Sequence, residues 1–253
     1  MTLLEVSNIS KSFGGVNAVT DVSFRVHAGS IYSVIGPNGA GKTTLFNLVT
    51  GVYLPDHGVV HLKGKPVHGV SPAVLATMGV ARTFQNLQIC MNMTAIENVM
   101  VGAHLHLDRN PLKAVLRLPS IRSRDRQLFD EAAELMASVG LGNYIHAHAD
   151  SLSYGLLKRL EIARALAMRP TILFLDEPAA GLNPNETDEI ADVIRKVRDT
   201  GVTIVLVEHD MKMVMRLSDR ILVMESGKTL TEGTAEQVRH DPQVIAAYLG
   251  APA

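Results

Sequence analysis

Nine consecutive residues near the start of the chain constrain its fold more than any other stretch. They are Gly36, Pro37, Asn38, Gly39, Ala40, Gly41, Lys42, Thr43 and Thr44. Their spacing matches G-x-x-x-x-G-K-[ST], and mainly apolar runs flank them, so the pattern predicts a strand, a glycine-rich loop and a helix. Glycines allow consecutive backbone N–H groups to point inward, where the helix N-terminus adds its positive end. The stretch therefore predicts a phosphate-binding loop.

Three side chains of this loop have expected roles toward a nucleotide. Lys42 would reach the terminal phosphates, the Thr43 hydroxyl would bind Mg²⁺, and Thr44 would add a hydrogen bond to an inner phosphate.

Composition narrows the remaining classes of protein. The apolar runs of the 253-residue chain are far shorter than the ~20 residues of a membrane helix, and no signal sequence opens it, so we expect a soluble, cytoplasmic protein. The single cysteine, Cys90, excludes an intrachain disulfide framework. A net charge of −1, 4% aromatic residues and no tryptophan offer little to nucleic acid, so we expect no such partner.

The segments around the loop are predicted to be rich in strands. Residues 3–26 alternate in hydrophobicity like a hairpin, and residues 58–67 indicate a strand, a Gly-Lys turn and a return strand that joins the same layer. Phe13 lies in a turn of the first segment. It is either a half-buried hydrophobic residue or a ring on which a nucleotide base stacks.

Polar residues follow three predicted strands. Residues 78–85 indicate a buried strand that ends on Gln85, which is either a satisfied strand end or a ligand of metal and water. The stretch 172–178 indicates an apolar strand that ends in two carboxylates, Asp176 and Glu177. Beside a phosphate-binding loop, Asp176 is placed to hold Mg²⁺ through water, and Glu177 to orient and deprotonate an attacking water. His209 follows the buried strand 202–207, which makes a γ-phosphate contact plausible.

Helical spacing dominates residues 92–160, which we interpret as an inserted helical segment. Its part between Arg109 and Arg126 is strongly basic, and is either a solvated face or a surface for an acidic partner or lipid headgroups. Ser153 is an expected N-cap before a helix at 158–168. Further helices are expected at 186–199 and just before Gly250, with a hairpin at 221–232 between them.

In this order, the motifs resemble those of an ABC transporter ATP-binding subunit over almost the whole chain. The series comprises Walker A at 36–44, Gln85, a signature-like Leu-Ser-Tyr-Gly at 152–155, Walker B at 172–177, Gly-Leu-Asn at 181–183, and His209. The stretches 81–85, 93–98, 159–165, 177–184 and 247–250 resemble, more closely, the LivG-type ATPase of branched-chain amino-acid importers.

The resemblance implies an α/β fold: a P-loop NTPase core with a mixed, mainly parallel sheet, an antiparallel β layer and an inserted helical subdomain. Within a single domain, 1–253, the core would comprise 1–91 and 161–253, and the helical subdomain 92–160. Two such subunits, sister chains or two copies, are expected to close head to tail with ATP and Mg²⁺ between them.

The same resemblance implies roles for individual residues. Phe13 would stack on adenine, and Ser153 with the Gly155 N–H would bind the γ-phosphate of the partner's nucleotide, as a helix N-terminus can. Glu177 would polarise the water and His209 would steady the phosphate. Gln85 would sense the γ-phosphate and couple to the membrane subunit. The metal ligands would be Thr43, Gln85 and Asp176.

Partners and location also follow from the resemblance. We expect transmembrane permease subunits, a second ATP-binding subunit and, indirectly, a periplasmic or extracellular solute-binding protein. The chain would then lie peripherally on the cytoplasmic face of the inner membrane, as an ATPase that drives amino-acid import.

The signature departs from the usual Leu-Ser-Gly-Gly-Gln pattern. Tyr154 replaces the first glycine and Leu156 the glutamine, so an amide that normally faces the partner's nucleotide is missing. We expect a modest loss of turnover at the site that this signature completes. Other cargoes, such as urea, short amides or an exported lipid, remain open, as does a non-transport ABC protein that clamps nucleic acid. A P-loop kinase or GTPase would leave Ser153 and His209 without a role.

Overall fold

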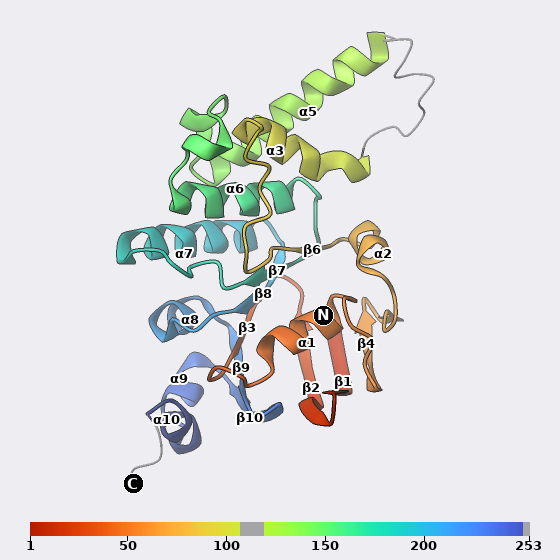
Figure 1. Cartoon of the computed structure of the whole chain (residues 1–253), viewed down its shortest axis with the longest axis vertical. Coiled ribbons are helices and arrows are strands. Elements are labelled where there is room, and N and C mark those ends of the chain that lie inside the picture. The colour runs from red at the N-terminus through yellow and green to blue at the C-terminus, as the bar shows by residue number, and fades with distance from the viewer. Residues whose placement is uncertain (107–118, 250–253) are drawn as a thin grey trace.

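The computed structural model describes residues 1–106 and 119–249, which form two β-sheets flanked by helices (Figure 1). The smaller sheet is antiparallel, in the order β2-β1-β4-β5. It comprises β1 (Thr2–Phe13), β2 (Val16–His27), β4 (His57–Leu62) and β5 (Lys65–Pro66). Its hydrophobic residues alternate with exposed ones because one face is covered and the other faces solvent. The predicted antiparallel layer, with residues 58–67 in it, is confirmed.

The larger sheet carries the phosphate-binding loop. Its order is β10-β9-β3-β8-β7-β6, and all neighbours are parallel except the β9–β10 hairpin. Its strands are β3 (Ile31–Ile35), β6 (Val80–Arg82), β7 (Ile172–Asp176), β8 (Thr203–Val207), β9 (Arg220–Glu225) and β10 (Lys228–Gly233). In the register, Val207 pairs with both Val34 and Asp176. The carboxyl ends of β3, β8 and β7 are therefore level, so the residues that follow them meet at one edge.

Helices cover both faces of the larger sheet. In Figure 1, α3, α5 and α6 lie together at the end of the molecule away from the smaller sheet. The described helices are α1 (Lys42–Val49), α2 (Pro72–Thr77), α3 (Ala95–Gly102), α5 (Pro119–Ser138), α6 (Tyr154–Leu166), α7 (Pro184–Asp199), α8 (Met211–Leu217), α9 (Ala235–Arg239) and α10 (Pro242–Leu249), with short 3₁₀ turns η1 (Ala103–His106), η2 (Gly142–Tyr144) and η3 (Ala149–Ser151). The division of the chain into a core and a helical subdomain stays a prediction.

Two large apolar cores hold these layers together, and a smaller third one packs α8, α9 and α10 against β3 and β9. One fills the space between the two sheets and around α1, where the rings of Phe46 and Phe174 meet edge to face at 5.4 Å. The other joins the opposite face of the larger sheet to α3, α5, α6 and α7. Strands β3, β7 and β8 are buried along their whole length, which is why they are nearly continuous apolar runs in the sequence.

The structure corrects several predicted boundaries. The strand expected at 78–85 is limited to β6, because this edge strand pairs only with β7 and the chain leaves it after Thr83, so Gln85 lies in an exposed loop. The helix expected from Lys158 begins at Tyr154, where the Ser153 hydroxyl caps it.

Two further findings concern the membrane and the basic stretch. Among the described helices, none combines the length and the hydrophobicity that crossing a bilayer requires. Of the basic residues between Arg109 and Arg126, Arg109, Lys113 and Arg117 lie outside the described residues. The interpretation of that stretch therefore stays a prediction.

Candidate nucleotide-binding and catalytic site

The phosphate-binding loop joins β3 to α1 and lies close to other backbone segments. An added Cβ at Gly36 would overlap the carbonyl oxygen of Met224, and one at Gly41 the carbonyl oxygen of Ala18. Gly41 also has a φ of 96° and is the N-cap of α1, where no side-chain hydrogen bond caps the helix. The N–H groups of the first helical turn are thereby left for a ligand, as an anion site requires.

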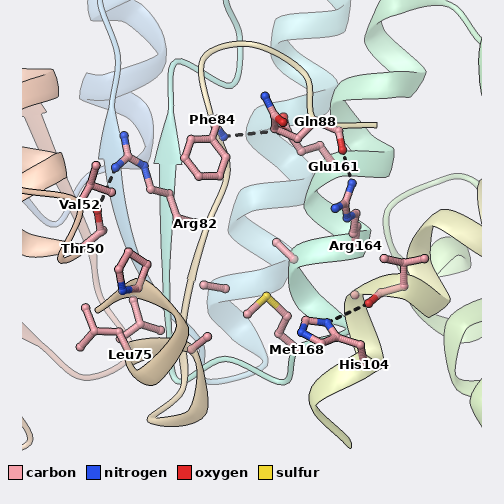
Figure 2. A pocket seen from close by; sticks show the side chains of 17 residues that line it. Thr50, Val52, Leu75, Arg82, Phe84, Gln88, His104, Glu161, Arg164 and Met168 are labelled. Carbon is pink, nitrogen blue, oxygen red and sulfur yellow. Dashed lines mark hydrogen bonds between the residues drawn. The ribbon is translucent and has the colours of Figure 1, made fainter. Parts of the chain in front are cut away.

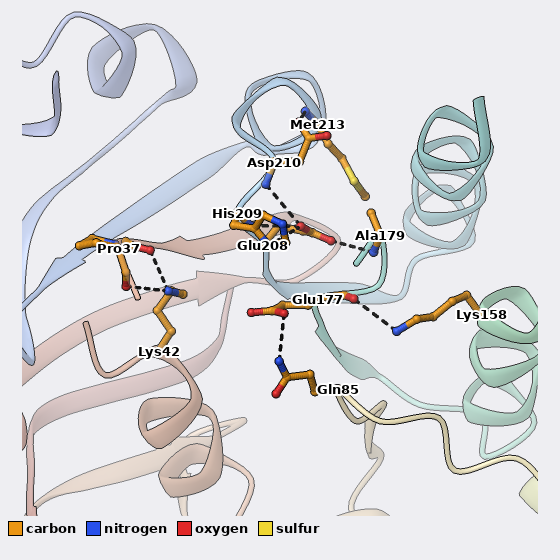
Figure 3. Close-up of polar contacts among 11 residues, drawn as sticks. Pro37, Lys42, Gln85, Lys158, Glu177, Ala179, Glu208, His209, Asp210 and Met213 are labelled. Carbon is orange, nitrogen blue, oxygen red and sulfur yellow. Dashed lines mark hydrogen bonds and ion pairs between the residues drawn. The ribbon is translucent and has the colours of Figure 1, made fainter. Parts of the chain in front are cut away.

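Lys42 is folded back onto the loop. Its Nζ donates to the carbonyl oxygens of Gly36 at 2.7 Å and Pro37 at 3.0 Å (Figure 3). Burial lowers the pKa of Lys42, while the carboxylates of Glu177 and Asp176 oppose that shift. An ammonium group and two carboxylates therefore influence one another at this edge of the sheet. In the same helix turn Thr43 is exposed and Thr44 is half-buried.

The two acids after β7 have different environments. Asp176 is 3% exposed, and burial raises the pKa of its carboxyl group although an ion pair with Arg82 opposes the shift. Glu177 is half-buried and has a left-handed backbone, with φ of 49°. Its N–H donates to the Val207 carbonyl oxygen at 2.9 Å, which ties the end of β7 to the end of β8.

Gln85 and Glu177 are brought together from segments far apart in the sequence. The Gln85 Nε2 donates to the Glu177 Oε2 at 3.2 Å (Figure 3). The amide comes from the exposed loop after β6, whereas the carboxylate stands at the end of β7. Gln85 and Glu177 thus lie together, although Gln85 does not end a strand as expected.

His209 lies just beyond β8 and its side chain is 62% exposed. Glu208 beside it is fully buried and was given no role by the sequence reasoning. Its Oε1 accepts from the Ala179 N–H at 2.8 Å, and its Oε2 from the N–H groups of His209 at 3.0 Å and Asp210 at 3.4 Å. Burial raises the pKa of Glu208. This carboxyl group holds the backbone of His209 in place. An acidic residue directly after a buried strand was the feature of the sequence from which this role could have been predicted.

Arg82 and Lys158 are two further residues that the sequence reasoning missed. Arg82 donates to Asp176 Oδ2 at 2.8 Å. Lys158, in α6, is buried and its Nζ lies 3.4 Å from the Glu177 carbonyl oxygen, to which it donates. Each could have been predicted as a basic residue within an otherwise apolar strand or helix face, because a buried cation needs an anionic or carbonyl partner.

Ser153 and Gly155 stand at the N-terminus of α6. The Ser153 hydroxyl accepts from the Leu156 N–H at 3.5 Å, and Gly155 packs so closely on α7 that an added Cβ would lie 2.7 Å from the Glu186 Oε1. Among the hydrogen bonds and ion pairs of the described residues, none joins either residue to loop 36–44. Within one chain they therefore form a separate cluster.

Phe13 ends β1 and is 43% exposed. Its ring meets Tyr53 edge to face at 5.3 Å, and the Lys11 ammonium lies 5.5 Å from its centroid. The hairpin that carries it packs closely against the phosphate-binding loop, because a Cβ added at Gly41 would overlap the Ala18 carbonyl oxygen on β2. Both readings of Phe13 fit this position.

A pocket of about 290 Å³ opens beside the loop that carries Gln85 (Figure 2). Phe84 and Gln88 of that loop line it together with Glu161 and Arg164 of α6. Glu161 accepts from the Phe84 N–H at 3.5 Å, and Arg164 donates to the Gln88 carbonyl oxygen. Helix α6 thus holds both ends of the Gln85 loop.

The donors near the phosphate-binding loop suit a hard cation. The Thr43 hydroxyl, the Asp176 carboxylate and the Gln85 amide all offer oxygen, the ligand type that Mg²⁺ prefers. No group of three or more His, Cys, Asp or Glu side chains within residues 1–106 and 119–249 is arranged to hold a metal. Such a donor set fits an ion whose coordination is completed by substrate phosphates rather than one that protein ligands alone surround.

Comparisons with known proteins agree with this geometry. Residues 19–180 match the family model described as ABC transporter, and residues 228–253 match that of the branched-chain amino acid ATP-binding cassette transporter. The chain is 47% identical to the high-affinity branched-chain amino acid transport ATP-binding protein BraF of Pseudomonas aeruginosa and 45% identical to LivG of Escherichia coli, over 98% of each chain. A solved ATP-binding cassette of an ABC transporter in its ADP conformation superimposes with a TM-score of 0.86 at 32% identity, covering 99% of both chains.

Proposed function

The chain belongs to the ABC transporter family, as one of its ATP-hydrolysing cassettes, and we propose that it drives the import of branched-chain amino acids. The predicted family and fold are thereby confirmed. One observation supports the chemistry of the proposal: Glu177, which accepts a hydrogen bond from Gln85, follows β7 at the sheet edge where the loop after β3 leads to Lys42 at the start of α1. Near-identical length and 45–47% identity to BraF and LivG support the cargo.

Nucleotide binding is assigned to loop 36–44 and the start of α1. The uncapped N–H groups of α1 receive the phosphates, and Lys42 exchanges its two carbonyl partners for phosphate oxygens. That exchange is favourable because the phosphate oxygens are anionic, and a hydrogen bond between two charged groups is stronger than one to a neutral carbonyl. Phe13 is proposed to stack on the base.

Thr43, Asp176 and Gln85 are proposed to hold Mg²⁺, directly or through water. When bound, the ion supplies charge neutralisation at the phosphates that separate during hydrolysis. Thr43 contributes from the exposed first turn of α1. Asp176 contributes from the end of β7, where its carboxylate is fixed by Arg82.

Glu177 is the proposed general base. Its carboxylate takes one proton from the attacking water, whose oxygen forms the new bond to the γ-phosphorus while the bond to the β–γ bridging oxygen breaks, giving ADP and phosphate. Gln85 orients the carboxylate through its amide, and His209 contacts the γ-phosphate from the end of β8. Glu208 keeps the backbone under His209 in place.

The separate position of Ser153 and Gly155 supports a two-subunit site. Ser153 caps a helix whose N-terminus is suited to an anion, yet within the described residues no hydrogen bond or ion pair joins it to its own loop 36–44. We propose that it serves the nucleotide bound by a second subunit, which is a sister ATPase or another copy of this chain. ATP would then close the pair and hydrolysis would reopen it.

The permease contact is proposed at the pocket of Figure 2. One loop supplies both Gln85, which reaches Glu177, and Phe84 and Gln88, which line the pocket. A permease segment seated there would alter the position of Gln85 directly. This contact would hold the chain peripherally on the cytoplasmic face of the membrane, with a solute-binding protein acting on the other side.

Replacing Glu177 by glutamine tests the proposed hydrolysis. Glutamine keeps the size and the acceptor oxygen but takes no proton from water, so we expect phosphate release to fall at least about a hundredfold, the lower range for a general base. ATP should then accumulate in a closed dimer, measured by light scattering. Glu5→Gln, on the outer face of β1, is the matched control. Hydrolysis by Glu177→Gln at the parent rate would remove Glu177 as the base.

The cargo needs its own experiment. The complex copurified with its permease subunits and solute-binding protein is reconstituted in vesicles, and uptake of labelled leucine is compared with that of labelled urea. ATP-dependent leucine uptake is expected. Uptake of urea but not leucine would replace the cargo while leaving the ATPase assignment intact.

A further inference from the structure

Arg82 links two parts of the candidate metal site that are far apart in the sequence. One terminal nitrogen, Nη1, donates to Asn47 Oδ1 at 2.7 Å and to Thr50 Oγ1 at 2.8 Å, both on or directly after α1. The other, Nη2, donates to Asp176 Oδ2 at 2.8 Å at the end of β7. Figure 2 shows the side chain extending toward Thr50. The guanidinium thus bridges the helix that follows the phosphate-binding loop to the proposed metal-binding carboxylate.

The side chain has little freedom to leave this position. It is 9% exposed, and its guanidinium carbon lies 5.7 Å from the ring centroid of Phe46 and 5.1 Å from that of Phe84. Cation–π contact and burial both restrict its rotamers. A bridge fixed in this way transmits the position of one end to the other.

The spacing of residues along α1 connects the Arg82 contacts with the proposed metal ligand Thr43. Thr43, Asn47 and Thr50 follow one another at i, i+4 and i+7, so they lie on one face of the helix. Arg82 therefore donates its hydrogen bonds to the same face of the helix that carries the proposed metal ligand Thr43. Through α1, the guanidinium relates the Thr43 hydroxyl to the Asp176 carboxylate.

Neutralising the buried charge of Asp176 is a simpler role for Arg82. That role requires the contact to Oδ2 but leaves the two bonds to α1 unexplained, because Asn47 and Thr50 carry no charge. A guanidinium that shares its donors between a carboxylate and a helix is suited to orienting a ligand, as partners of metal-binding groups do.

We propose that Arg82 is a positioning residue for the Mg²⁺ site, which sets the placement of the Asp176 carboxylate relative to Thr43. The inference rests on the proposed function. It assigns to Arg82 an effect on how strongly Mg²⁺ tightens nucleotide binding, and no direct contact with nucleotide or metal.

The test measures binding of a fluorescent ATP analogue to the full chain, first in EDTA and then during titration with Mg²⁺. In Arg82→Met, we expect the affinity for the analogue in EDTA to lie within about twofold of the parent value. The Mg²⁺ concentration that gives half of the Mg²⁺-dependent increase in affinity should rise about tenfold or more, as is typical when a partner of a metal ligand is lost. Arg82→Lys keeps the charge and should recover part of that loss. Arg25→Met, which breaks a surface ion pair with Glu5, is the matched control and should match the parent.

Asn47→Ala keeps the proposal falsifiable if Arg82→Met does not fold. It removes one acceptor on α1 without touching the ion pair to Asp176, and should raise the Mg²⁺ requirement about threefold, the effect of a net hydrogen bond of ordinary strength. An Asn47→Ala titration identical to that of the parent, or an equal loss of affinity with and without Mg²⁺ in Arg82→Lys, would overturn the positioning role. A parent chain that binds the analogue neither in EDTA nor with saturating Mg²⁺ would instead overturn the proposed nucleotide site.

Discussion

Leu156→Gln restores the amide that the usual signature carries, and its effects on stability and turnover have opposite signs. Leu156 is the third residue of α6, is half-buried, and packs against the apolar core that joins the larger sheet to α3, α5, α6 and α7. Full burial of a leucine stabilises by about 1.5–3 kcal/mol, so losing a half-buried one costs about 1 kcal/mol. Glutamine and leucine have similar helix propensity, so α6 itself is unaffected. For a domain of this size, the expected fall in melting temperature is about 2–4 °C.

The expected gain in turnover arises at the proposed site between two subunits. One added hydrogen bond to the partner's nucleotide contributes about 1 kcal/mol, which is roughly fivefold in rate if it forms in the transition state. We therefore expect a less stable chain with a turnover up to about fivefold higher. The assay is phosphate release by the chain assembled with its permease and second ATPase subunit, beside a thermal melt of the isolated chain.

Leu156→Met separates the two effects. It replaces leucine by an apolar side chain of similar volume and adds no amide, so both its melting temperature and its phosphate release should stay near the parent values. An unchanged rate in Leu156→Gln, with the melting temperature lowered as expected, would refute the argument that the missing amide limits turnover.

Gly41→Ala should lower ATP affinity at least about tenfold, because the added Cβ meets the Ala18 carbonyl and a φ of 96° costs an L-residue about 1–2 kcal/mol. Gly39→Ala has a φ of 82° but open space, so it should lose less in a fluorescent-nucleotide titration; equal losses would contradict the steric argument. Glu208→Gln should alter the pH dependence of stability. Burial raises the pKa of Glu208, so the folded protein binds the proton of this carboxyl group more tightly than the unfolded chain does. The free energy of unfolding therefore falls as the pH rises from 4.5 toward the raised pKa, by about 1.4 kcal/mol for each unit by which the pKa is raised. Glutamine does not titrate, so the variant lacks that decline; parallel urea-unfolding profiles from about pH 4 to pH 7 would count against it.

The grouping of the candidate site was predictable from the sequence for a simple reason. Parallel strands end at one edge of a sheet, so Glu177 and His209 had to follow β7 and β8 toward the loop after β3. Local rules also placed Ser153 correctly, because an N-cap depends on residues three positions apart. These predictions needed only periodicity and spacing.

The missed features depend on tertiary contacts. Arg82 meets Asp176 across 94 positions, and Glu208 accepts from the Ala179 N–H across 29. Neither partner is marked by spacing, since side chains that reach distant backbone or carboxylate groups leave no periodic pattern. The length of β6 was overestimated for a related reason: an apolar run shows that residues are buried, but pairing with β7 decides where a strand ends.

The left-handed backbone of Glu177 has a consequence for protein engineering. Glycine or asparagine at this position would relax a φ of 49° at a gain of about 1 kcal/mol, and a library screened only for heat resistance would retain either. Both would also discard the carboxylate assigned to the attacking water. Durability and turnover oppose each other at position 177, so libraries built for thermal tolerance should keep this residue fixed.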